Sequence, residues 1–304
     1  MPRAASTLAA VFVAAALATG ACARQAPQGA PPPSTGSRFP VTLTDDEGVK
    51  LTLEAPPRRI VTFAPSHTEI VFALGLGDRL VGVSGPFDDY PPQATDIERV
   101  AGAGGVEPNI EKVVALEPDV VLTAFIGGQW KERLRDVGIP VFTTLASSLD
   151  DTLEDIETIG RLTGAPDEAA SLTDRLAQRA RAVTSRVGEA PRVSCFLDLG
   201  DLFTVGPGSL EFDLLERAGC DPITAQADDP YPQWSVEQLV EDDPDVFLIG
   251  EGISARQETA RPGIRGLTAV DEGRVSEVNS DLISRPGPRV VDGLEQLADL
   301  LHAG

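Results

Sequence analysis

Six aromatic side chains lie where a strand or turn is expected to leave its sheet, and their chemistry suits stacking against a flat ligand. Aromatic residues make up only 5% of the 304 residues, so rings outside a core are informative. In α/β sheets, ligands bind in the crevice outside the carboxyl ends of the strands, where ring faces supply contact area. The six are Phe87, Tyr90, Phe125, Phe203, Tyr231 and Trp234.

These side chains also have a plainer interpretation. One or two of the six rings could instead pack under their own loops. Asp281 lies in the loop segment 279–289 and could hold the polar edge of a ligand, or could simply be a turn residue. We expect two crevices that face each other to form one aromatic-walled cleft, with Asp281 orienting the ligand.

Residues suited to catalysis or to metal binding are scarce. His67 and His302 are the two imidazoles, and no Gly-x-Ser-x-Gly segment occurs. A serine hydrolase would have to pair Ser66 with His67, but both are expected at a helix start, where capping explains them. Three Cys and two His leave little material for a zinc site. We therefore expect no enzymatic activity, no metal site and no cofactor, with an exported hydrolase using Ser66 and His67 as the remote alternative.

The elements that must position these residues alternate between strand and helix. A hairpin is expected at 41–53, around an Asp-Asp-Glu-Gly turn. Ser66 and Glu69 have the spacing of a capping box, so a helix is expected to begin there. The alternation predicts an α/β fold with mostly parallel sheets. Further strands are expected at 59–63, 80–83, 119–124 and 140–144, and further helices at 109–116 and 133–137.

A helical stretch separates two such regions. Residues 149–187 carry apolar side chains at helical spacing, interrupted at Gly164-Ala165-Pro166. One long helix is expected over 169–187, and alternation resumes from Pro191. The predicted domains are an N-terminal α/β lobe at 38–148, a helical connection with the long helix at 149–189, and a C-terminal α/β lobe at 190–304.

One segment of the first lobe recurs in the second. Residues 109–122 align without gaps with residues 235–248, at an offset of 126 residues. Both segments predict a helix, a Pro-Asp turn and a buried strand, and Glu111 and Glu237 occupy equivalent positions. A generic helix–strand unit would account for part of this likeness.

The N-terminus has the features of an export signal. Arg3 precedes the apolar run 8–18, which is too short to span about 30 Å of hydrocarbon, so residues 1–21 are expected to be a signal peptide. Small residues before Cys22 resemble a bacterial lipobox, although Thr19 stands where that motif prefers an aliphatic residue. Residues 22–37 then form a Pro-rich flexible tether. Lipidation of Cys22 would hold the protein at a membrane, whereas cleavage beyond Cys22 would release it.

The net charge and the expected export limit which partners the protein can have. The 25 Lys and Arg against 47 Asp and Glu give a net charge of −22, which argues against nucleic acid and against electrostatic docking on anionic lipid. An exported protein meets an oxidising compartment, so Cys195 and Cys220 are candidates for a disulfide. The alternative is two buried thiols, since Cys195 lies in the apolar run 193–197 and the sequence does not give their separation.

Five segments of the chain carry a recognisable pattern: 59–78, 89–94, 109–119, 230–238 and the Asn-Ser-Asp…Pro-Arg pattern within 279–289. They resemble the periplasmic binding proteins for iron–siderophores, haem and vitamin B12, most of all the cobalamin-binding members. The resemblance covers residues 38–302. It implies two α/β lobes joined by a single long rigid helix, and the substrate-binding component of an ABC importer located in the cell envelope.

The resemblance also assigns roles. The family docks one Glu per lobe onto Arg residues of the membrane permease, which places Glu111 and Glu237 there; their alternative is an ordinary solvated carboxylate. Phe87, Phe125, Phe203 and Tyr231 fall at or close to ligand-contact positions, and Asp281 matches a polar contact. Leu282 replaces an aromatic residue, and a Trp of the cobalamin binders has no counterpart near 103–108.

These roles imply a specific set of partners. The expected ligand is a metal chelate, namely a cobalamin-like corrinoid, with a ferric siderophore or haem as the alternative. Few Arg residues line the matched positions, apart from Arg285, which weakens the case for a highly anionic siderophore. The expected protein partners are an ABC permease and its ATPase. The chain is expected to be a monomer that meets the membrane only through its lipid anchor.

Overall fold

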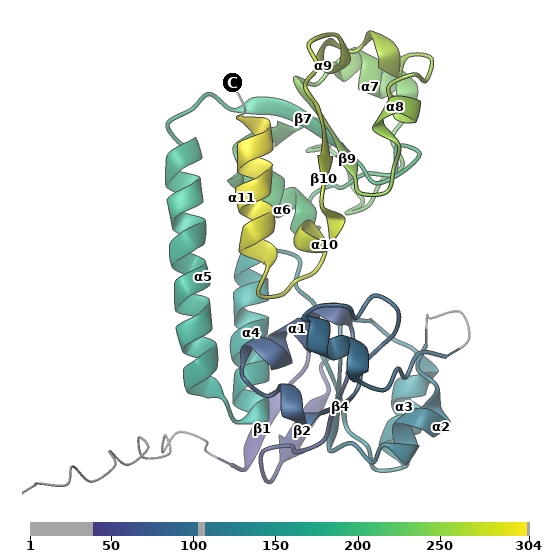
Figure 1. Cartoon of the computed structure of the whole chain (residues 1–304), viewed down its shortest axis with the longest axis vertical. Coiled ribbons are helices and arrows are strands. Elements are labelled where there is room, and N and C mark those ends of the chain that lie inside the picture. The colour runs from purple at the N-terminus through teal and green to yellow at the C-terminus, as the bar shows by residue number, and fades with distance from the viewer. Residues whose placement is uncertain (1–38, 103–106, 303–304) are drawn as a thin grey trace, which may run out of the picture. The chain divides into compact units, whose positions relative to one another are not determined.

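The computed structural model describes residues 39–102 and 107–302 (Figure 1). The predicted signal peptide, Cys22 and the tether at 22–37 lie outside these residues. Within the described part, no helix combines the length and apolar character needed to cross a membrane.

The N-terminal lobe is a parallel sheet preceded by a hairpin. The hairpin pairs β1 (Val41–Thr44) with β2 (Lys50–Leu53) in antiparallel register. The four-stranded sheet has the order β4-β3-β5-β6 and all its pairs are parallel, as predicted. Its elements are β3 (Ile60–Phe63), α1 (Pro65–Ala73), β4 (Leu80–Gly82), α2 (Ile110–Ala115), β5 (Val120–Thr123), α3 (Gln129–Asp136) and β6 (Val141–Thr143), with short 3-10 helices at Gly77–Arg79 and Pro92–Asp96.

The C-terminal lobe repeats this topology. Its parallel sheet has the order β10-β9-β7-β8, so in both lobes the first strand lies between the second and the third. Its elements are β7 (Val193–Asp198), α6 (Leu210–Arg217), β8 (Cys220–Pro222), α7 (Val236–Asp242), β9 (Val246–Gly250), α8 (Ala255–Glu258), α9 (Thr268–Asp271), β10 (Val275–Val278), α10 (Ser280–Ile283) and α11 (Val290–Leu301), with a 3-10 helix at Ile264–Gly266.

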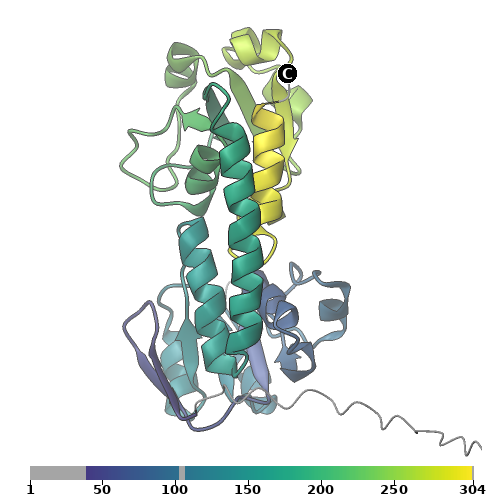
Figure 2. The same ribbon diagram turned by 90° about the vertical axis from the view of Figure 1, so that its left-hand side faces the viewer.

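Two helices connect the lobes. They are α4 (Leu149–Thr163) and the predicted long helix α5 (Pro166–Val187), which lies alongside α4 and α11 (Figures 1 and 2). The break between them falls where the sequence predicts it. Gly164 has a φ of +81°, the left-handed conformation that favours glycine at a helix end, and Pro166 begins α5, where its missing N–H costs nothing.

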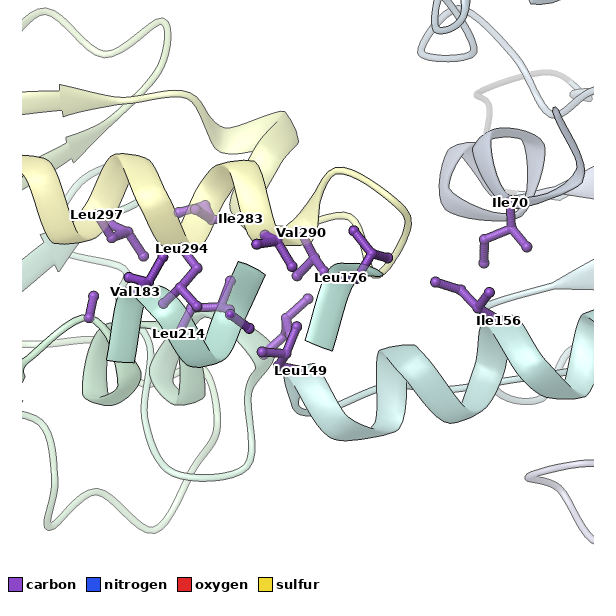
Figure 3. Close-up of a cluster of buried hydrophobic side chains, with 14 of the residues drawn as sticks. Ile70, Leu149, Ile156, Leu176, Val183, Leu214, Ile283, Val290, Leu294 and Leu297 are labelled. Atoms are coloured by element: carbon purple, nitrogen blue, oxygen red, sulfur yellow. The ribbon is translucent and has the colours of Figure 1, made fainter. Parts of the chain in front are cut away.

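One hydrophobic core runs through both lobes and the connection. Ile60 and Ile70 of the first lobe belong to the same buried cluster as Leu197 and Val246 of the second. Because α4 and α5 contribute side chains to this cluster throughout, a hinge between the lobes would have to disrupt close packing. Figure 3 shows part of it, with Leu149 and Ile156 of α4, Leu176 and Val183 of α5, and Leu294 and Leu297 of α11.

The start of α1 differs from the capping box predicted at Ser66 and Glu69. The N-cap is Ala64, no side chain caps the helix, and Pro65 occupies the first turn. Proline fixes the helical φ and lacks one of the N–H groups that a cap would satisfy. Ser66 and His67 are therefore inside the helix, and the capping explanation for them is wrong.

The segment that recurs in the sequence also recurs in the structure. Asn109 accepts a hydrogen bond from the Lys112 amide at the start of α2, and Ser235 does the same for the Gln238 amide at the start of α7. Each helix is followed by a buried strand at the same place in its sheet, β5 or β9. The two lobes therefore share this unit in detail.

A disulfide joins Cys195 of β7 to Cys220 of β8, with their Cα atoms 5.9 Å apart. The two strands are parallel neighbours. The bridge cross-links one side of the C-terminal sheet, and both residues are fully buried.

Candidate ligand-binding site

Four predicted rings extend from loops at the carboxyl ends of strands and remain exposed. Phe87 follows β4, Phe125 follows β5, Phe203 follows β7, and Tyr231 lies in the segment between β8 and α7. Their exposed fractions are 69%, 45%, 41% and 43% in that order. Large aromatic side chains that stay this exposed on ordered loops are typical of an interaction site.

The two rings of the C-terminal lobe form a stacked pair. The centroids of Phe203 and Tyr231 are 6.2 Å apart and their planes differ by 17°. The Tyr231 hydroxyl donates to buried Glu211 at 3.2 Å, and burial together with this carboxylate raises the pKa of Tyr231. Burial also raises the pKa of Glu211. The hydrogen bond fixes the tilt of the Tyr231 ring, so the pair offers a pre-formed apolar face.

In the N-terminal lobe, Phe125 leans on a buried aromatic cluster. Its centroid lies 5.6 Å from that of Phe63, and Phe63 in turn lies 5.5 Å from Trp130 in an edge-to-face arrangement. Phe125 therefore packs against the core and is also partly exposed to solvent. Trp130 is thus part of the buried cluster against which Phe125 packs.

The remaining two predicted rings lie elsewhere. Trp234 is only partly exposed and packs against a buried cluster of the C-terminal lobe that includes Leu202 and Phe247. Tyr90 stacks against the guanidinium of Arg289, with 3.9 Å between the Arg289 Cζ and the ring centroid. The position of Trp234 agrees with the plainer interpretation that some rings pack under loops, whereas Tyr90 stays 43% exposed and stacks on a cation of the other lobe.

Tyr90 also lines a cavity of about 410 Å³ where the two lobes meet. Phe72 of α1 and Pro288 before α11 form part of its wall. Phe87, Phe125, Phe203 and Tyr231 are not among the residues that line this cavity, so Tyr90 lies apart from those four rings, at the contact between the lobes.

A charged network links the lobes beside Asp281, and sequence reasoning missed most of it. The Glu69 carboxylate is 1% exposed and receives two hydrogen bonds from Arg289, at 2.6 and 2.8 Å. Arg285 lies 3.5 Å from Glu69, 3.7 Å from Asp89 and 2.7 Å from Asp281. Asp281 is thus paired with a cation, and the charge of Arg285 is offset by three carboxylates.

One signal could have indicated this network. Glu69 directly precedes the apolar run of α1, on a helix whose side chains are mostly buried. A buried carboxylate requires a cation nearby. The sequence does not say which cation, because Arg285 and Arg289 lie more than 200 residues away along the chain.

The pair considered for hydrolysis is enclosed. Ser66 and His67 are 3% and 2% exposed. The Ser66 Oγ is 3.5 Å from His67 Nδ1, at the outer limit of a hydrogen bond, and Nε2 of His67 contacts the Thr144 hydroxyl at 3.0 Å. Burial lowers the pKa of His67 to about 4. A substrate could not reach Ser66 without local unfolding.

Glu111 and Glu237 are exposed in the first turns of α2 and α7. One turn further on, Val114 and Val240 are also exposed, at 38% and 46%. An acidic and an apolar side chain therefore stand together at matching positions of the two lobes.

Comparison with known proteins gives consistent results. A family model described as periplasmic binding protein matches residues 60–282. The cobalamin-binding protein of Halobacterium salinarum is 37% identical over 297 residues, covering 93% of this chain and 80% of that protein. An uncharacterised ABC transporter substrate-binding lipoprotein of Bacillus subtilis is 31% identical over 275 residues, covering 87% and 86%. The crystal structure of the periplasmic vitamin B12 binding protein of Vibrio cholerae matches with a TM-score of 0.73 and 31% identity, covering 82% of this chain and 98% of that one.

Proposed function

This chain belongs to the periplasmic binding protein family, and we propose that it captures a cobalamin-like corrinoid between its lobes and delivers it to the permease of an ABC importer. The relatives named for cobalamin and vitamin B12 motivate the choice of ligand.

The stacked pair of Phe203 and Tyr231 is the observation that carries this proposal. It offers a rigid apolar face to one side of a bulky planar ligand, and Phe125 and Phe87 supply rings from the other lobe. Stacking and apolar burial favour such a ligand without requiring charge. Asp281 pairs with Arg285 through one carboxylate oxygen and stays 43% exposed, so this side chain can also meet a polar edge of the ligand.

A ferric siderophore or haem is the second candidate, because Arg285, beside Asp281, is an Arg residue among the positions matched to ligand contacts. Its guanidinium is already close to Glu69, Asp89 and Asp281. An anionic ligand would have to compete with these three carboxylates, so the local charge favours an uncharged or cationic chelate.

Parallel calorimetric titrations test the ligand. The mature protein is titrated with cyanocobalamin, haemin and a ferric hydroxamate siderophore under the same conditions. We expect saturable one-to-one binding of cyanocobalamin, at least about 10-fold tighter than that of the other two. Tighter binding of haemin or of the siderophore would contradict the choice of corrinoid.

We also infer export and lipid anchoring at Cys22, which lies outside the described residues. The lipobox-like sequence supports the inference, as does the likeness to a substrate-binding lipoprotein. Cys22→Ser should move the protein from the membrane fraction to the soluble envelope fraction. Continued association of that variant with membranes would contradict lipidation of Cys22.

A further inference from the structure

The loop that follows β5 holds an exposed aliphatic side chain beside a predicted ligand-contact ring. Ile126 is 76% exposed, the highest fraction among the large apolar side chains in the described part of the chain. It adjoins Phe125 at the carboxyl end of a central strand. Phe125 and Ile126 are thus two consecutive exposed apolar side chains, and contiguous exposed apolar surface marks a site where another molecule binds.

The ion pair between Lys131 and Glu47 holds this loop in place. The Lys131 ammonium, on α3, donates to Glu47 Oε2 at 2.7 Å and to the Phe125 carbonyl. The other carboxylate oxygen of Glu47 accepts from the Gly127 N–H. The carbonyl before Ile126 is therefore bound by Lys131, and the N–H after Ile126 is bound by Glu47.

The ion pair is itself strongly constrained. Lys131 is 2% exposed and Glu47 is 17% exposed, and the Thr143 hydroxyl contacts both charged groups at 3.0 Å. Burial opposes ionisation of Glu47, but hydrogen bonds from Lys131, Gly127 and Thr143 outweigh it and lower the pKa of this carboxyl. A buried ammonium without its partner is costly, so the loop is held in one arrangement.

The two glycines after Ile126 make that arrangement attainable. Gly127 and Gly128 have φ values of +68° and +95°, a region that side chains with a Cβ rarely enter. A Cβ on Gly128 would lie 2.5 Å from the Trp130 ring. These two conformations, and the close approach of Trp130 at Gly128, therefore favour glycine where the chain turns from Ile126 into α3.

We infer that Ile126 contacts the apolar surface of the bound ligand and that the Glu47–Lys131 pair is the positioning device that holds Phe125 and Ile126 ready for it. This inference rests on the proposed function and adds a contact residue and its support. Glu47 comes from the turn of the β1–β2 hairpin, so the hairpin has a role in binding without itself touching the ligand. Holding a loop in its bound conformation reduces the entropy lost on binding.

The contact is tested with Ile126→Ala against Val137→Ala. Val137 is 59% exposed in the same lobe and lies at the end of α3. In calorimetric titrations with cyanocobalamin, Ile126→Ala should weaken binding about 10-fold, as expected when an aliphatic side chain is lost from a buried contact. Val137→Ala should stay within about twofold of the wild type. Equal affinities of the two variants would overturn the contact.

The positioning role is tested with Glu47→Ala and Glu47→Gln against Glu98→Gln. Glu98 forms a Lys pair of the same length, 2.7 Å to Lys112, but both side chains are about half exposed. Glu47→Ala should speed hydrogen exchange of the Gly127 amide at least about 10-fold while the amides of β5 stay protected. Glu47→Gln keeps an acceptor for that amide and should restore much of its protection. If Glu47→Ala does not fold, Glu47→Ala with Lys131→Met removes the unpaired charge and serves instead.

The outcomes separate this inference from the proposed function. Faster exchange at Gly127 together with weaker cyanocobalamin binding supports the positioning role. Faster exchange with unchanged affinity in a wild type that binds cyanocobalamin refutes it and leaves the proposed function standing. Unchanged exchange at Gly127 refutes the role of Glu47 whatever the ligand. A wild type that does not bind cyanocobalamin refutes the proposed function and, with it, the assigned contact.

Discussion

Phe203 and Tyr231 are stacked rings that stay partly exposed, and their arrangement is fixed before any ligand arrives. Phe203→Ala and Tyr231→Ala should each weaken cyanocobalamin binding about 10-fold, because an aromatic pair contributes about 0.5–1.5 kcal/mol beyond the area that it buries. Calorimetric titration measures the effect.

Tyr231→Phe is the matched variant for this prediction. It keeps the ring and removes only the hydroxyl that donates to Glu211. We expect it to bind within about threefold of the wild type, since the hydroxyl contacts Glu211 and the ring face that stacks is kept. A loss as large as that of Tyr231→Ala would show that the hydroxyl, and not the ring face, carries the contact.

Asp155 makes stability depend on pH. This carboxyl on α4 is 8% exposed, and burial, with Asp46, Asp151 and Glu154 nearby, raises its pKa to about 7. The folded state thus holds the proton more tightly than the unfolded chain, where the pKa is near 3.8. Its contribution to stability is fully present below pH 4 and is lost as the pH rises to about 7.

Asp155→Asn should remove this loss. The shift from 3.8 to about 7 corresponds to about 4 kcal/mol at 1.36 kcal/mol per pH unit. The stability of Asp155→Asn relative to the wild type should therefore increase between pH 4 and pH 8, as measured by urea unfolding at several pH values. The stability of the variant must be compared with that of the wild type at each pH, because His67 contributes a pH dependence of the opposite sign. Burial lowers the pKa of His67 to about 4, so the folded state loses stability as the pH falls from about 6.5 to 4. A difference that does not vary with pH would contradict the assignment to Asp155.

Among the elements, α1 and the loop before α11 are joined by the ion pair of Glu69 and Arg289. Arg289→Met would leave Glu69 buried, with Arg285 as its nearest cation at 3.5 Å. We expect a loss of about 3–5 kcal/mol in the free energy of unfolding, the usual cost of a buried charge that loses its partner. Chemical denaturation measures it.

Arg179→Met is the control for this prediction. Arg179 pairs with Asp292 and Glu295 of α11, but its side chain is 42% exposed. An exposed pair contributes about 0–1 kcal/mol, so this variant should change stability little. The double variant Glu69→Gln with Arg289→Met should recover part of the loss. Equal effects of Arg179→Met and Arg289→Met would show that burial of Glu69 does not matter.

The elements themselves were largely predictable, whereas contacts between distant segments were not. Short apolar runs predicted the strands at 59–63 and 119–124, and the spacing of Leu172, Leu176 and Val183 predicted the buried face of α5. These are local patterns, set by which faces a strand or a helix must bury. The predicted start of α1 was wrong because Pro65 and a capping box compete for the same turn. In the structure, the helix begins at Pro65 and no side chain caps it.

The candidate site was predictable only in part for the same reason. Exposed rings after strands follow from the chain order of an α/β fold, which placed Phe87, Phe125, Phe203 and Tyr231. Whether a loop ring meets solvent depends on residues far along the chain. Tyr90 stacks on Arg289, and Trp234 packs against the buried cluster that includes Phe247; neither arrangement has a local signal. Glu47 was likewise read only as part of a turn, because its partner Lys131 lies 84 residues away.

At the scale of the whole molecule, the two lobes present the same small surface twice. Glu111 with Val114 and Glu237 with Val240 are exposed at the same offset, on helices that begin with the same kind of cap. We propose that a permease engages both. One exposed ion pair contributes only about 0.2–1 kcal/mol, so useful docking requires both lobes to bind at once, which raises the effective concentration of the second contact.

Substitution of both acids should therefore have more than an additive effect on transport. Glu111→Ala or Glu237→Ala alone should reduce ligand uptake by reconstituted permease and ATPase several-fold, and the two together should abolish it. Glu132→Ala with Glu272→Ala, one exposed glutamate from each lobe outside α2 and α7, changes the net charge equally and should leave uptake intact. Cyanocobalamin affinity should be the same in all four variants, because none of these glutamates lies on a loop that carries a ring of the site. Reduced affinity in the Glu111 and Glu237 variants would show that these acids act in ligand binding. An equal loss of uptake in the control variant would show that their effect comes from net charge alone.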